Sequence, residues 1–426
     1  MSTRVPMAPP RSGPSATRAV TYDDLYARWE KGNWRAMEYD FAQDREDWHG
    51  KFSDIQRRAA LWNYALFFHG EDAVADNLSP FIDAAPREEQ KYFLATQQVD
   101  EARHAVLFAR FMRDVAGAGG DTASSLTATA PQLTWGFRKV FGRLDRMADE
   151  LRRDRSRPKL AQAITLYHLV VEAALAQPGQ HFIDESLTKR DLLPGFREGI
   201  RNVSRDEQRH IAFGVKMLAD LVREDPDCKP AIEELLREML PFTTAVFVPP
   251  GWDERYVTAF GFTLQDVYAH GADALDHRLR AAGLEPAMMR VGLPFDVPPE
   301  ERARRALTLL RAGYLGAPNG PVTPNAEATA LLFDSLRRQI DTSIAPGAKI
   351  LWDFTDAEPW HMAIHNGSTA AAPGRVEDPD LVFRCRFEDW LDIAAGRTDP
   401  WRALLTRRVR PSGKLRMLAR APKLFG

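Results

Sequence analysis

A five-residue pattern occurs twice in this chain, because residues 100–104 and residues 206–210 both read D-E-x-R-H. In each copy a glutamate and a histidine stand three residues apart, and on a helix that spacing places both side chains on one face. Two helices of this kind that face each other can hold two metal ions between them. The repeat therefore predicts a fold in which two helices present carboxylate and imidazole groups to a shared interior site.

Length and composition narrow the class of protein. The 426 residues are enough for two domains, and the net charge of −2 argues against nucleic acid as the main partner. Cys228 and Cys385 are too few for a disulfide framework or a cysteine-based metal site, which favours a reducing, cytoplasmic compartment. Because the sequence has no run of about 18 apolar residues, no membrane span is expected. Residues 1–20 contain no apolar core segment and are interpreted as a disordered tail rather than a signal peptide.

Residues 21–285 show the long-period apolar pattern of a helical bundle. In 194–223 the apolar side chains follow the spacing of one helix face, interrupted only by the glutamate and histidine of the second D-E-x-R-H copy. Pro178 and Gly179 lie inside the third long helix and are expected to kink it or to open its hydrogen bonds. Long helices are expected at 61–82, 86–116, 158–187 and 194–223, further helices at 134–153, 229–246 and 252–282, and a loop at 117–134.

The character of the chain changes after residue 285. Residues 286–324 hold seven prolines and one helical stretch at 298–313, so this segment is interpreted as a linker. Residues 325–426 combine a helix at 325–343 with short alternating strands, which indicates a small α+β domain. Strands are expected at 349–354, 360–365 and 368–372, then an alternating stretch at 381–386, a helix at 387–396, a further strand and a short terminal helix. The expected fold class is therefore mainly α, with a small α+β domain at the end.

Two glutamates outside the repeated pattern complete a candidate metal site. Glu71 and Glu172 have the most apolar surroundings of any acidic residues in the chain, and an ionised carboxylate in such surroundings needs a partner or a metal. Dimetal carboxylate bundles take a Glu-x-x-His pair from two helices and one glutamate from each of two others. Four carboxylates with two imidazoles suit iron or manganese better than zinc, magnesium or calcium. The predicted ligands are Glu71, Glu101, His104, Glu172, Glu207 and His210.

The other polar residues of the two D-E-x-R-H copies leave two interpretations open. Their aspartates and arginines either hydrogen-bond to the ligating histidines or form salt bridges between the helices; these residues are Asp100, Arg103, Asp206 and Arg209. Two histidines outside the pattern, His69 and His168, are interpreted as core or rim residues rather than as ligands.

In the order and spacing of these six predicted ligands, the region from about 20 to 285 resembles the ferritin-like dimetal family, and within it the small subunit of ribonucleotide reductase. The order E, E-x-x-H, E, E-x-x-H and the 35-residue step from Glu172 to Glu207 are similar to that branch. They are unlike the arylamine N-oxygenases, which have an additional histidine ligand. In standard reductase subunits a radical-bearing tyrosine lies one turn beyond the first histidine, and here that position is Phe108. The resemblance disfavours a tyrosyl-radical subunit and leaves open a manganese/iron reductase subunit without that tyrosine.

Two further residues make the bundle similar to the ligand-binding oxidases of this superfamily, which bind a long-chain fatty acid at a manganese/iron or di-iron site. In that family a valine three residues after the first glutamate becomes ether-linked to a tyrosine five residues before the third. The corresponding residues here are Val74 and Tyr167. The resemblance implies such a cross-link, and the alternative is that both side chains belong to the core.

Residues 325–426 look like a sterol carrier protein 2-type domain. The similar stretches are 350–356, 359–364, 378–383 and 387–396. That fold is a twisted sheet covered by helices around an apolar tunnel, and related domains also serve as structural or dimerising modules. Because the region shows no acid/base or metal cluster in its sequence, the resemblance implies a binding role for lipid or acyl chains.

Together these features predict an O2-dependent dinuclear metal oxidase or oxygenase. Its expected cofactor is Fe/Fe or Mn/Fe, and its expected substrate is a lipid-like or other apolar molecule that is oxidised at a C–H bond. We expect a homodimer whose partners are O2, a long-chain or other apolar ligand and an electron donor of unknown identity. Two alternatives compete with this prediction: a radical-generating reductase small subunit, and a non-catalytic lipid-binding or metal-storage protein.

Overall fold

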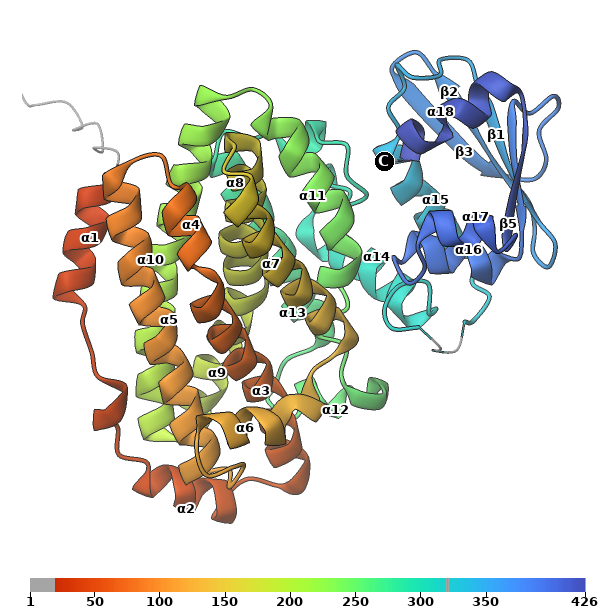
Figure 1. Ribbon diagram of the computed structural model, residues 1–426. Helices are drawn as coiled ribbons and strands as arrows, with labels where there is room; N and C mark the ends of the chain where they lie inside the picture. Colours follow the sequence, from red (N-terminus) through yellow and green to blue (C-terminus); the bar gives the residue numbers. More distant parts are fainter. Residues whose placement is uncertain (1–19, 319, 321, 426) are drawn as a thin grey trace, which may run out of the picture.

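A computed structural model describes residues 20–318, 320 and 322–425 of the protein. A helical bundle makes up the larger part, and a small domain with a five-stranded sheet lies beside it (Figure 1). The prediction of a mainly α chain with a helical bundle followed by a small α+β domain is confirmed. Of the predicted disordered tail, all but Val20 lies outside the described residues.

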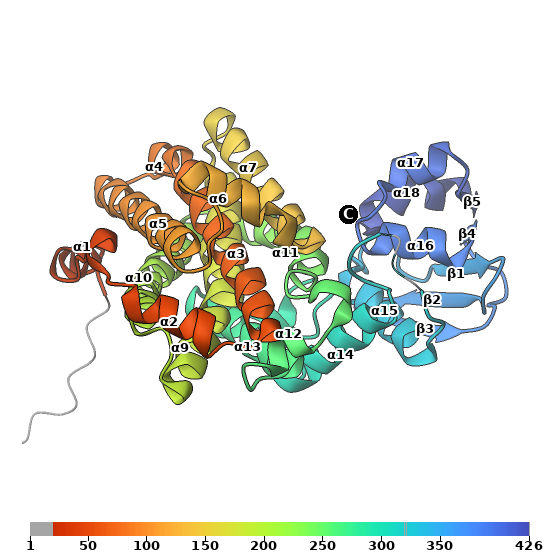
Figure 2. The same cartoon turned by 90° about the horizontal axis from the view of Figure 1, so that it is seen from below.

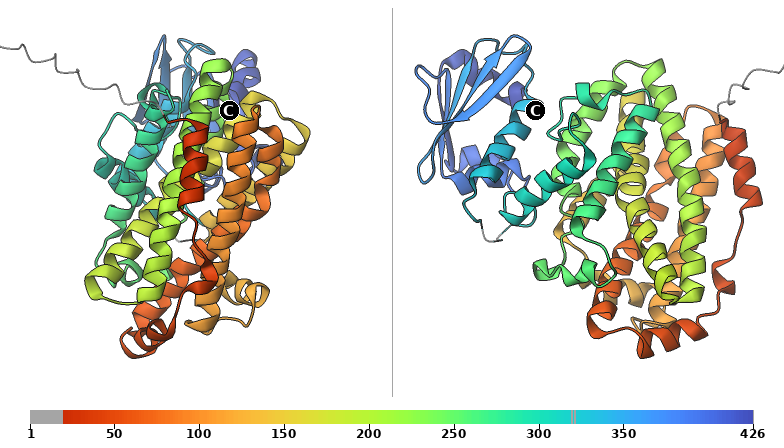
Figure 3. Two further views of the ribbon diagram at one scale, coloured as in Figure 1. Left: turned by 90° about the vertical axis from the view of Figure 1, so that its left-hand side faces the viewer. Right: turned by 180° about the vertical axis from the view of Figure 1, so that it is seen from behind.

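Four long helical runs form the centre of the bundle and lie side by side (Figures 1 and 3). Three of them are single helices. The remaining run is a continuous path in which a π-helix joins two α-helices. The four runs are α3 (Asp54–Asn77), α5 (Glu88–Asp114), the path of α8 (Arg157–Ile164), η3 (Thr165–Ala176) and α9 (Gln177–Arg190), and α10 (Pro194–Glu224).

Side-chain caps determine where two of these helices begin. The Ser53 hydroxyl accepts the Gln56 N–H, and the Gln56 side chain accepts the Ser53 N–H, so α3 starts seven residues before the expected position at 61. At the start of α10 the buried carboxylate of Asp44 accepts the N–H groups of Gly195 and Phe196. The first N–H groups of a helix have no partner inside it, and Asp44 supplies one for two of them. The partial positive charge at this end of α10 also favours the ionised Asp44 carboxylate.

The π-helix η3 is the main departure from the expected third helix. At its end the Gln177 N–H donates to the Glu172 carbonyl, five residues back, and Pro178 has no N–H with which to resume the α-helical pattern. The expected opening of the helix near Pro178 is therefore present, and it extends towards the amino terminus. In a helix with bonds between residues five apart, Tyr167 and Glu172 lie on one face, whereas an α-helix would separate them by about 140°.

Close backbone approaches hold η3 between two neighbouring helices. A Cβ atom at Gly214 of α10 would lie 2.2 Å from the Cβ of His168, so only glycine allows α10 to pass this side chain. On the other side, a Cβ at Gly271 of α13 (Leu264–Ala281) would lie 2.6 Å from the Ala174 carbonyl oxygen. The π-helix is thus held on two sides by close contact with a glycine of a neighbouring helix.

Shorter helices complete the bundle and differ from expectation in two places. The expected loop at 117–134 contains helix α6, because the Asp121 side chain caps it by accepting the Ser124 N–H. The single helix expected at 252–282 is divided into α12 and α13, and Gly261 lies between them with a φ of 92°. These helices are α1 (Tyr22–Lys31), α2 (Ala42–Gly50), α4 (Ser79–Ala84), α6 (Thr122–Thr129), α7 (Trp135–Arg153), α11 (Cys228–Thr243), α12 (Arg255–Thr258) and α13.

The segment between the bundle and the sheet contains α14 (Pro299–Arg311), which packs along α13. Arg302 of α14 is buried and forms an ion pair of 3.1 Å with Asp276 of α13. Its guanidinium carbon also lies over the Phe295 ring, 5.3 Å from the ring centroid. These contacts hold much of residues 286–324 against the bundle.

The C-terminal domain is a five-stranded sheet in the order β3-β2-β1-β4-β5. Strands β1 and β4 run parallel, and the other neighbouring pairs are antiparallel. Alternate residues of β2 are buried, so one face of the sheet packs against helices, as Figure 2 shows. The elements are α15 (Ala326–Gln339), β1 (Lys349–Phe354), β2 (Trp360–His365), β3 (Ser368–Pro373), β4 (Leu381–Cys385), α16 (Phe387–Ala394), α17 (Pro400–Leu405), β5 (Val409–Gly413) and α18 (Leu415–Phe425).

The two domains touch where α11 meets the loop after α16. A Cβ atom at Gly396, which has a φ of 66°, would lie 2.6 Å from the Phe242 ring of α11. Both the positive φ and the close ring therefore favour glycine at this position. Among the described residues, no helix is long and apolar enough to cross a membrane.

Candidate metal centre

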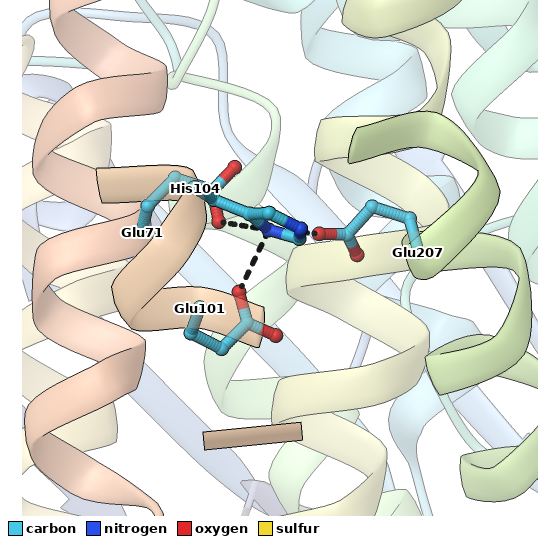
Figure 4. Close-up of side chains that lie close together, drawn as sticks. All are labelled: Glu71, Glu101, His104 and Glu207. Atoms are coloured by element: carbon cyan, nitrogen blue, oxygen red, sulfur yellow. Dashed lines mark hydrogen bonds and ion pairs between the residues drawn. The ribbon is translucent and has the colours of Figure 1, made fainter. Parts of the chain in front are cut away.

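The six predicted metal ligands come together in the interior of the bundle. Glu71 projects from α3, Glu172 from η3, and the two Glu-x-x-His pairs from α5 and α10. All six side chains are buried, and each histidine is completely inaccessible to solvent. Figure 4 shows four of them, Glu71, Glu101, His104 and Glu207, pointing towards one another from three helices.

The donor atoms form two groups that share one residue. Glu71, Glu101, His104 and Glu207 each offer an oxygen or nitrogen within 4.8 Å of the others, and Glu101, Glu172 and His210 do the same. Glu101 belongs to both groups. This arrangement can place one ion in each group with the Glu101 carboxylate between them.

One nitrogen of each histidine faces the carboxylates. The Nδ1 atom of His104 lies 3.3 Å from Glu71, 3.4 Å from Glu101 and 3.5 Å from Glu207. The Nδ1 atom of His210 lies 3.1 Å from Glu101. Each imidazole therefore presents its Nδ1 atom to the shared interior site.

The site fits two divalent metal ions. His210 Nδ1, Glu172 Oε2 and Glu207 Oε2 are buried without a hydrogen-bond partner in the described part of the chain. Four carboxylates nearly balance the charge of two divalent ions, and buried charge of this kind is stable when it coordinates a metal. A donor set of carboxylate oxygens and imidazole nitrogens suits iron or manganese.

Burial strongly perturbs the protonation of these groups. Loss of solvent raises the pKa of Glu71 and of Glu172 well above the usual value, and neighbouring carboxylates add to the shift. Burial also opposes ionisation of Glu101, but the positive charges of His210 and His104, whose Nδ1 atoms lie 3.1 Å and 3.4 Å away, outweigh it and hold the Glu101 pKa well below its usual range. Glu101 is thus the carboxylate best prepared to stay ionised between the two histidines.

The aspartates of the repeated pattern pair crosswise with its histidines. Asp100 of the first copy lies 3.1 Å from Nε2 of His210 in the second copy. Asp206 of the second copy lies 3.3 Å from Nε2 of His104 in the first. An aspartate at this position accepts the Nε2 proton, which fixes the ring and leaves Nδ1 available to a metal.

Arginines and tryptophans surround these aspartates. Arg209 forms ion pairs with both Asp100 and Asp206, and so does Arg103. Both interpretations left open by the sequence therefore apply. The aspartates face the histidines, and the arginines form salt bridges between the two helices.

Two indole N–H groups reach the same aspartates from the amino-terminal part of the chain. Trp29 Nε1 donates to Asp100 at 2.9 Å, and Trp34 Nε1 donates to Asp206 at 2.7 Å. Sequence reasoning missed both tryptophans, because nothing in their local pattern indicates a long-range partner.

Gln97 is a further residue that sequence reasoning did not assign to the site. Its Nε2 atom donates to Glu172 at 2.8 Å and to the Tyr167 hydroxyl at 3.0 Å. Its Oε1 atom lies 3.2 Å from Nε2 of His168. The available signal was its spacing, because Gln97 precedes Glu101 by four residues and therefore shares its helix face.

Tyr167 is buried, and its hydroxyl donates to Glu101 at 2.7 Å. Burial and the nearby carboxylate charges raise the Tyr167 pKa well above its usual value, so the phenol keeps its proton. His168 beside it is also buried, and burial lowers its pKa to about 3, so its imidazole is neutral. His69 is half-buried and lies 3.0 Å from the Thr129 hydroxyl. Neither of these two histidines belongs to the two donor groups.

Phe108 occupies the position where the resemblance to reductase subunits leads one to look for a tyrosine. Its ring is fully buried and stacks on Phe67 with centroids 5.9 Å apart. It also meets Phe196 edge-on at 5.7 Å. The site therefore has an apolar ring at this position and no hydroxyl group.

An apolar cavity opens beside the carboxylates, and we call it the metal-side cavity. The space inside it and at its mouth amounts to about 510 Å3. Glu71, Glu101, Glu172 and Glu207 line one part, and Val74 and Tyr167 also line it. The remaining lining residues are Leu66, Phe67, Gly70, Phe137, Phe141, Val171, Leu175, Ala176, Val246 and Phe247. A site with carboxylates at one end and aliphatic and aromatic walls suits a mainly apolar ligand.

Comparison with known proteins places both domains. Residues 18–246 match the family described as ribonucleotide reductase, small chain, and residues 341–426 match the SCP-2 sterol transfer family. Among solved structures, a variant of an R2-like ligand-binding oxidase with an anaerobically reconstituted Mn/Fe cofactor is 24% identical, with a TM-score of 0.52 over 61% of this chain and 92% of that chain. An R2-like ligand-binding oxidase from Sulfolobus acidocaldarius is 23% identical, with a TM-score of 0.53 over 68% of this chain and 98% of that chain.

Identities this low establish a shared fold, which is the ferritin-like bundle expected from the order of the ligands. The family match covers more than half of the sequence and includes all six buried donor residues. The chain therefore belongs to the ribonucleotide reductase small chain family and carries a C-terminal domain of the SCP-2 sterol transfer type.

Proposed function

We propose that this protein is an O2-dependent dinuclear metal oxidase or oxygenase that acts on an apolar substrate. Two ions, Fe/Fe or Mn/Fe, would be held by Glu71, Glu101, His104, Glu172, Glu207 and His210. The single observation that carries the proposal is the combination of this buried donor set with an apolar cavity that its four carboxylates line. The structural relatives with Mn/Fe cofactors support the choice of metals only by analogy of fold.

When bound, the metal pair would supply the electrons and the Lewis acidity that dioxygen chemistry requires. The chain's own residues supply geometry and a dry environment. Asp100 and Asp206 hold the two imidazoles with Nδ1 towards the site. Tyr167 keeps its own proton and donates a hydrogen bond of 2.7 Å to Glu101 Oε1. The apolar walls of the metal-side cavity exclude water from the reacting C–H bond.

The walls of the metal-side cavity favour a substrate with a long apolar part. No lysine or arginine is among the residues that line the cavity, so a substrate carboxylate would find its positive partner at the metal ions. The SCP-2-type domain supports the same substrate class, because its family name describes sterol transfer. We therefore propose a lipid-like or acyl substrate, with an electron donor still to be identified and a homodimer as the assembly.

We also propose that Val74 and Tyr167 become joined by an ether bond. Both side chains line the metal-side cavity, and the π-helical turn places Tyr167 on the same face as Glu172. The reaction would form a bond between the valine Cβ and the tyrosine oxygen. The valine C–H bond and the tyrosine O–H bond would break, and two protons and two electrons would leave the protein, with dioxygen as their acceptor. Digestion followed by mass spectrometry should then find one linked peptide pair that is lighter by two hydrogens, and separate unmodified peptides would contradict the cross-link.

Dioxygen consumption tests the proposed activity. Protein loaded with iron, or with manganese and iron, and then reduced should consume O2, and a long-chain fatty acid should change the rate. The metal-free protein is the control. Failure of the loaded, reduced protein to consume O2 with any apolar ligand would favour the non-catalytic lipid-binding or metal-storage alternative.

One observation favours a second candidate, a radical-generating reductase small subunit, since the family match carries that description. Against it stands Phe108, which has no hydroxyl to hold a tyrosyl radical. Co-purification with a large reductase subunit, and nucleotide reduction in its presence, would support this candidate over the oxidase.

A further inference from the structure

The C-terminal segment of the chain is strongly basic. Residues 400–426 contain eight lysines and arginines and no acidic residue, although the whole chain has 57 basic and 59 acidic residues. The rest of the protein is therefore acidic, and positive charge is concentrated in the C-terminal segment of the chain. Charge asymmetry of this kind is typical of a surface that binds an anionic partner.

Exposed apolar side chains lie within the same segment. Leu405 and Leu415 are each 85% exposed, the highest values among the large apolar residues that the structure describes, and Trp401 is 61% exposed. Trp401 and Leu405 are four residues apart on α17, so they project from the same side of that helix. A single exposed leucine is ordinary on a protein surface, but three large apolar side chains among unpaired cations point to an interfacial role.

The elements that carry these residues share one strand as a common neighbour. Helices α17 and α18 both contact β5, which is the edge strand farthest from β3 in the sheet. Figure 1 shows α18 towards one end of the domain and α17 towards the other, and Figure 2, seen from below, shows both on the side of the domain away from β2 and β3. The buried side chains of Met417 and Leu424 anchor α18 to the domain core. The basic and apolar groups are therefore presented by a folded surface.

Most of the exposed cations of this segment have no carboxylate partner in the described part of the chain. Arg408 pairs with Asp389 and Asp392, and Lys414 pairs with Asp380. Exposed side chains without an ion pair are Arg402, Arg407, Arg410, Arg416 and Lys423. Their charge is thus available to an external anion.

We propose that residues 400–425 form a docking face for an anionic lipid bilayer. Trp401, Leu405 and Leu415 would enter the interfacial layer, and the five unpaired cations would contact lipid phosphate groups. Tryptophan and leucine beside arginine are the residue types that occupy such an interface. The face would bring the SCP-2-type domain to a membrane surface without any membrane-spanning helix.

A bilayer explains this surface better than a nucleic acid does. Single-stranded nucleic acids are bound by several aromatic rings that stack on bases, together with a basic groove. The described side chains of residues 400–425 include one aromatic residue, Trp401. The two most exposed side chains are leucines, which have no favourable partner on a phosphate backbone but gain free energy in lipid.

Vesicle sedimentation with the full-length protein tests the proposal. The protein is mixed with vesicles of phosphatidylcholine alone, or of phosphatidylcholine with phosphatidylglycerol, and the bound fraction is measured after centrifugation. Binding should require phosphatidylglycerol and should weaken as salt is raised, because exposed charges are screened. Equal binding to both vesicle types, or binding to neither, overturns the proposal.

Two sets of variants locate the face. The triple variant R402Q/R407Q/R410Q should reduce the partition coefficient by about a hundredfold, since each basic residue near an anionic surface contributes roughly a fivefold effect. L405S/L415S should also weaken binding, and neither variant should lower the melting temperature, because these side chains are exposed. The matched control R35Q/R152Q/R255Q removes three exposed charges elsewhere and should keep binding within about threefold of the unmodified protein.

Two results would contradict this assignment. An equal loss of vesicle binding in the control triple variant would mean that net charge, rather than this face, decides binding. A single-stranded oligonucleotide that binds the protein and displaces it from anionic vesicles, with L405S/L415S binding vesicles normally, would assign the surface to nucleic acid.

Discussion

The two domains fill their interiors with different kinds of side chain. The bundle buries four glutamates and two histidines next to an apolar cavity. The described residues of the C-terminal domain bury no glutamate or histidine, and its core consists of apolar and aromatic side chains, with Phe333 stacked on Trp360 at 4.5 Å and Trp352 edge-on to Trp390 at 5.4 Å. Among the described residues, both groups of side chains that could hold a metal lie in the bundle.

This contrast indicates that the two interiors serve different purposes. Buried carboxylates cost free energy in the metal-free bundle, and that cost is offset when metal binds. An aromatic core contributes stability directly, through burial and ring contacts. Loss of a metal-site residue should therefore lower metal content, whereas loss of an aromatic core residue should lower the unfolding free energy and leave metal content unchanged.

The largest expected effect is that of Glu101→Ala. Because Glu101 belongs to both donor groups, its loss should abolish binding of both metals and with it O2 consumption. Metal content is measured by elemental mass spectrometry after purification. Glu388→Ala, at an exposed position of the C-terminal domain, is the matched control and should bind metal normally. Full metal occupancy in the Glu101 variant would contradict the assignment of the six ligands.

Trp352→Ala should produce the reverse pattern. Trp352 is completely buried in β1, and removal of a buried tryptophan side chain costs about 3–5 kcal/mol of unfolding free energy. Urea titration should show this loss in the transition of the C-terminal domain, while metal content under native conditions stays unchanged. The exposed Trp401→Ala change should alter the unfolding free energy by less than about 0.5 kcal/mol. Loss of metal in the Trp352 variant would mean that the two interiors are not independent.

Asp206→Asn tests how much an aspartate that contacts a ligating histidine contributes to metal affinity. The substitution keeps the shape of the side chain but removes the charge that faces Nε2 of His104. Metal affinity should fall by about 10–100-fold, as measured by competition with a chelator. Asp149→Asn, at an exposed position of α7, serves as the control. An unchanged affinity in the Asp206 variant would show that this aspartate is only a salt-bridge partner.

The smallest expected effect is that of Ser53→Ala. The change removes the cap of α3, the helix that carries Glu71, and should lower the unfolding free energy of the bundle by about 1 kcal/mol. Ser53→Asp retains an oxygen acceptor at the cap and should be close to neutral. A shift in the C-terminal transition, measured in the same urea titration, would disagree with the separation of the two interiors.

Much of the site could be predicted because its spacing is local. The Glu-x-x-His pairs on α5 and α10 follow from helical periodicity, and Glu71 and Glu172 stand out as acidic residues in apolar surroundings. The structure brings all six of these residues together. Their role as metal ligands remains a prediction.

Long-range and backbone features could not be predicted in the same way. The crosswise pairing of Asp100 with His210 depends on how two helices pass each other, which periodicity within one helix does not contain. The π-helix lies in a uniformly apolar stretch, where periods of 3.6 and of about five residues look alike. The misplaced loop at 117–134 shows a further limit, since small polar residues can also cap and form a short helix.

Crystallography with anomalous scattering at the iron and manganese absorption edges tests the central claim most directly. The protein would be crystallised after loading with both metals. Two separate peaks are predicted in the bundle interior, one near His104 and one near His210, with the Glu101 carboxylate between them. An interior without peaks, or a single ion bound away from both histidines, would contradict the dinuclear centre.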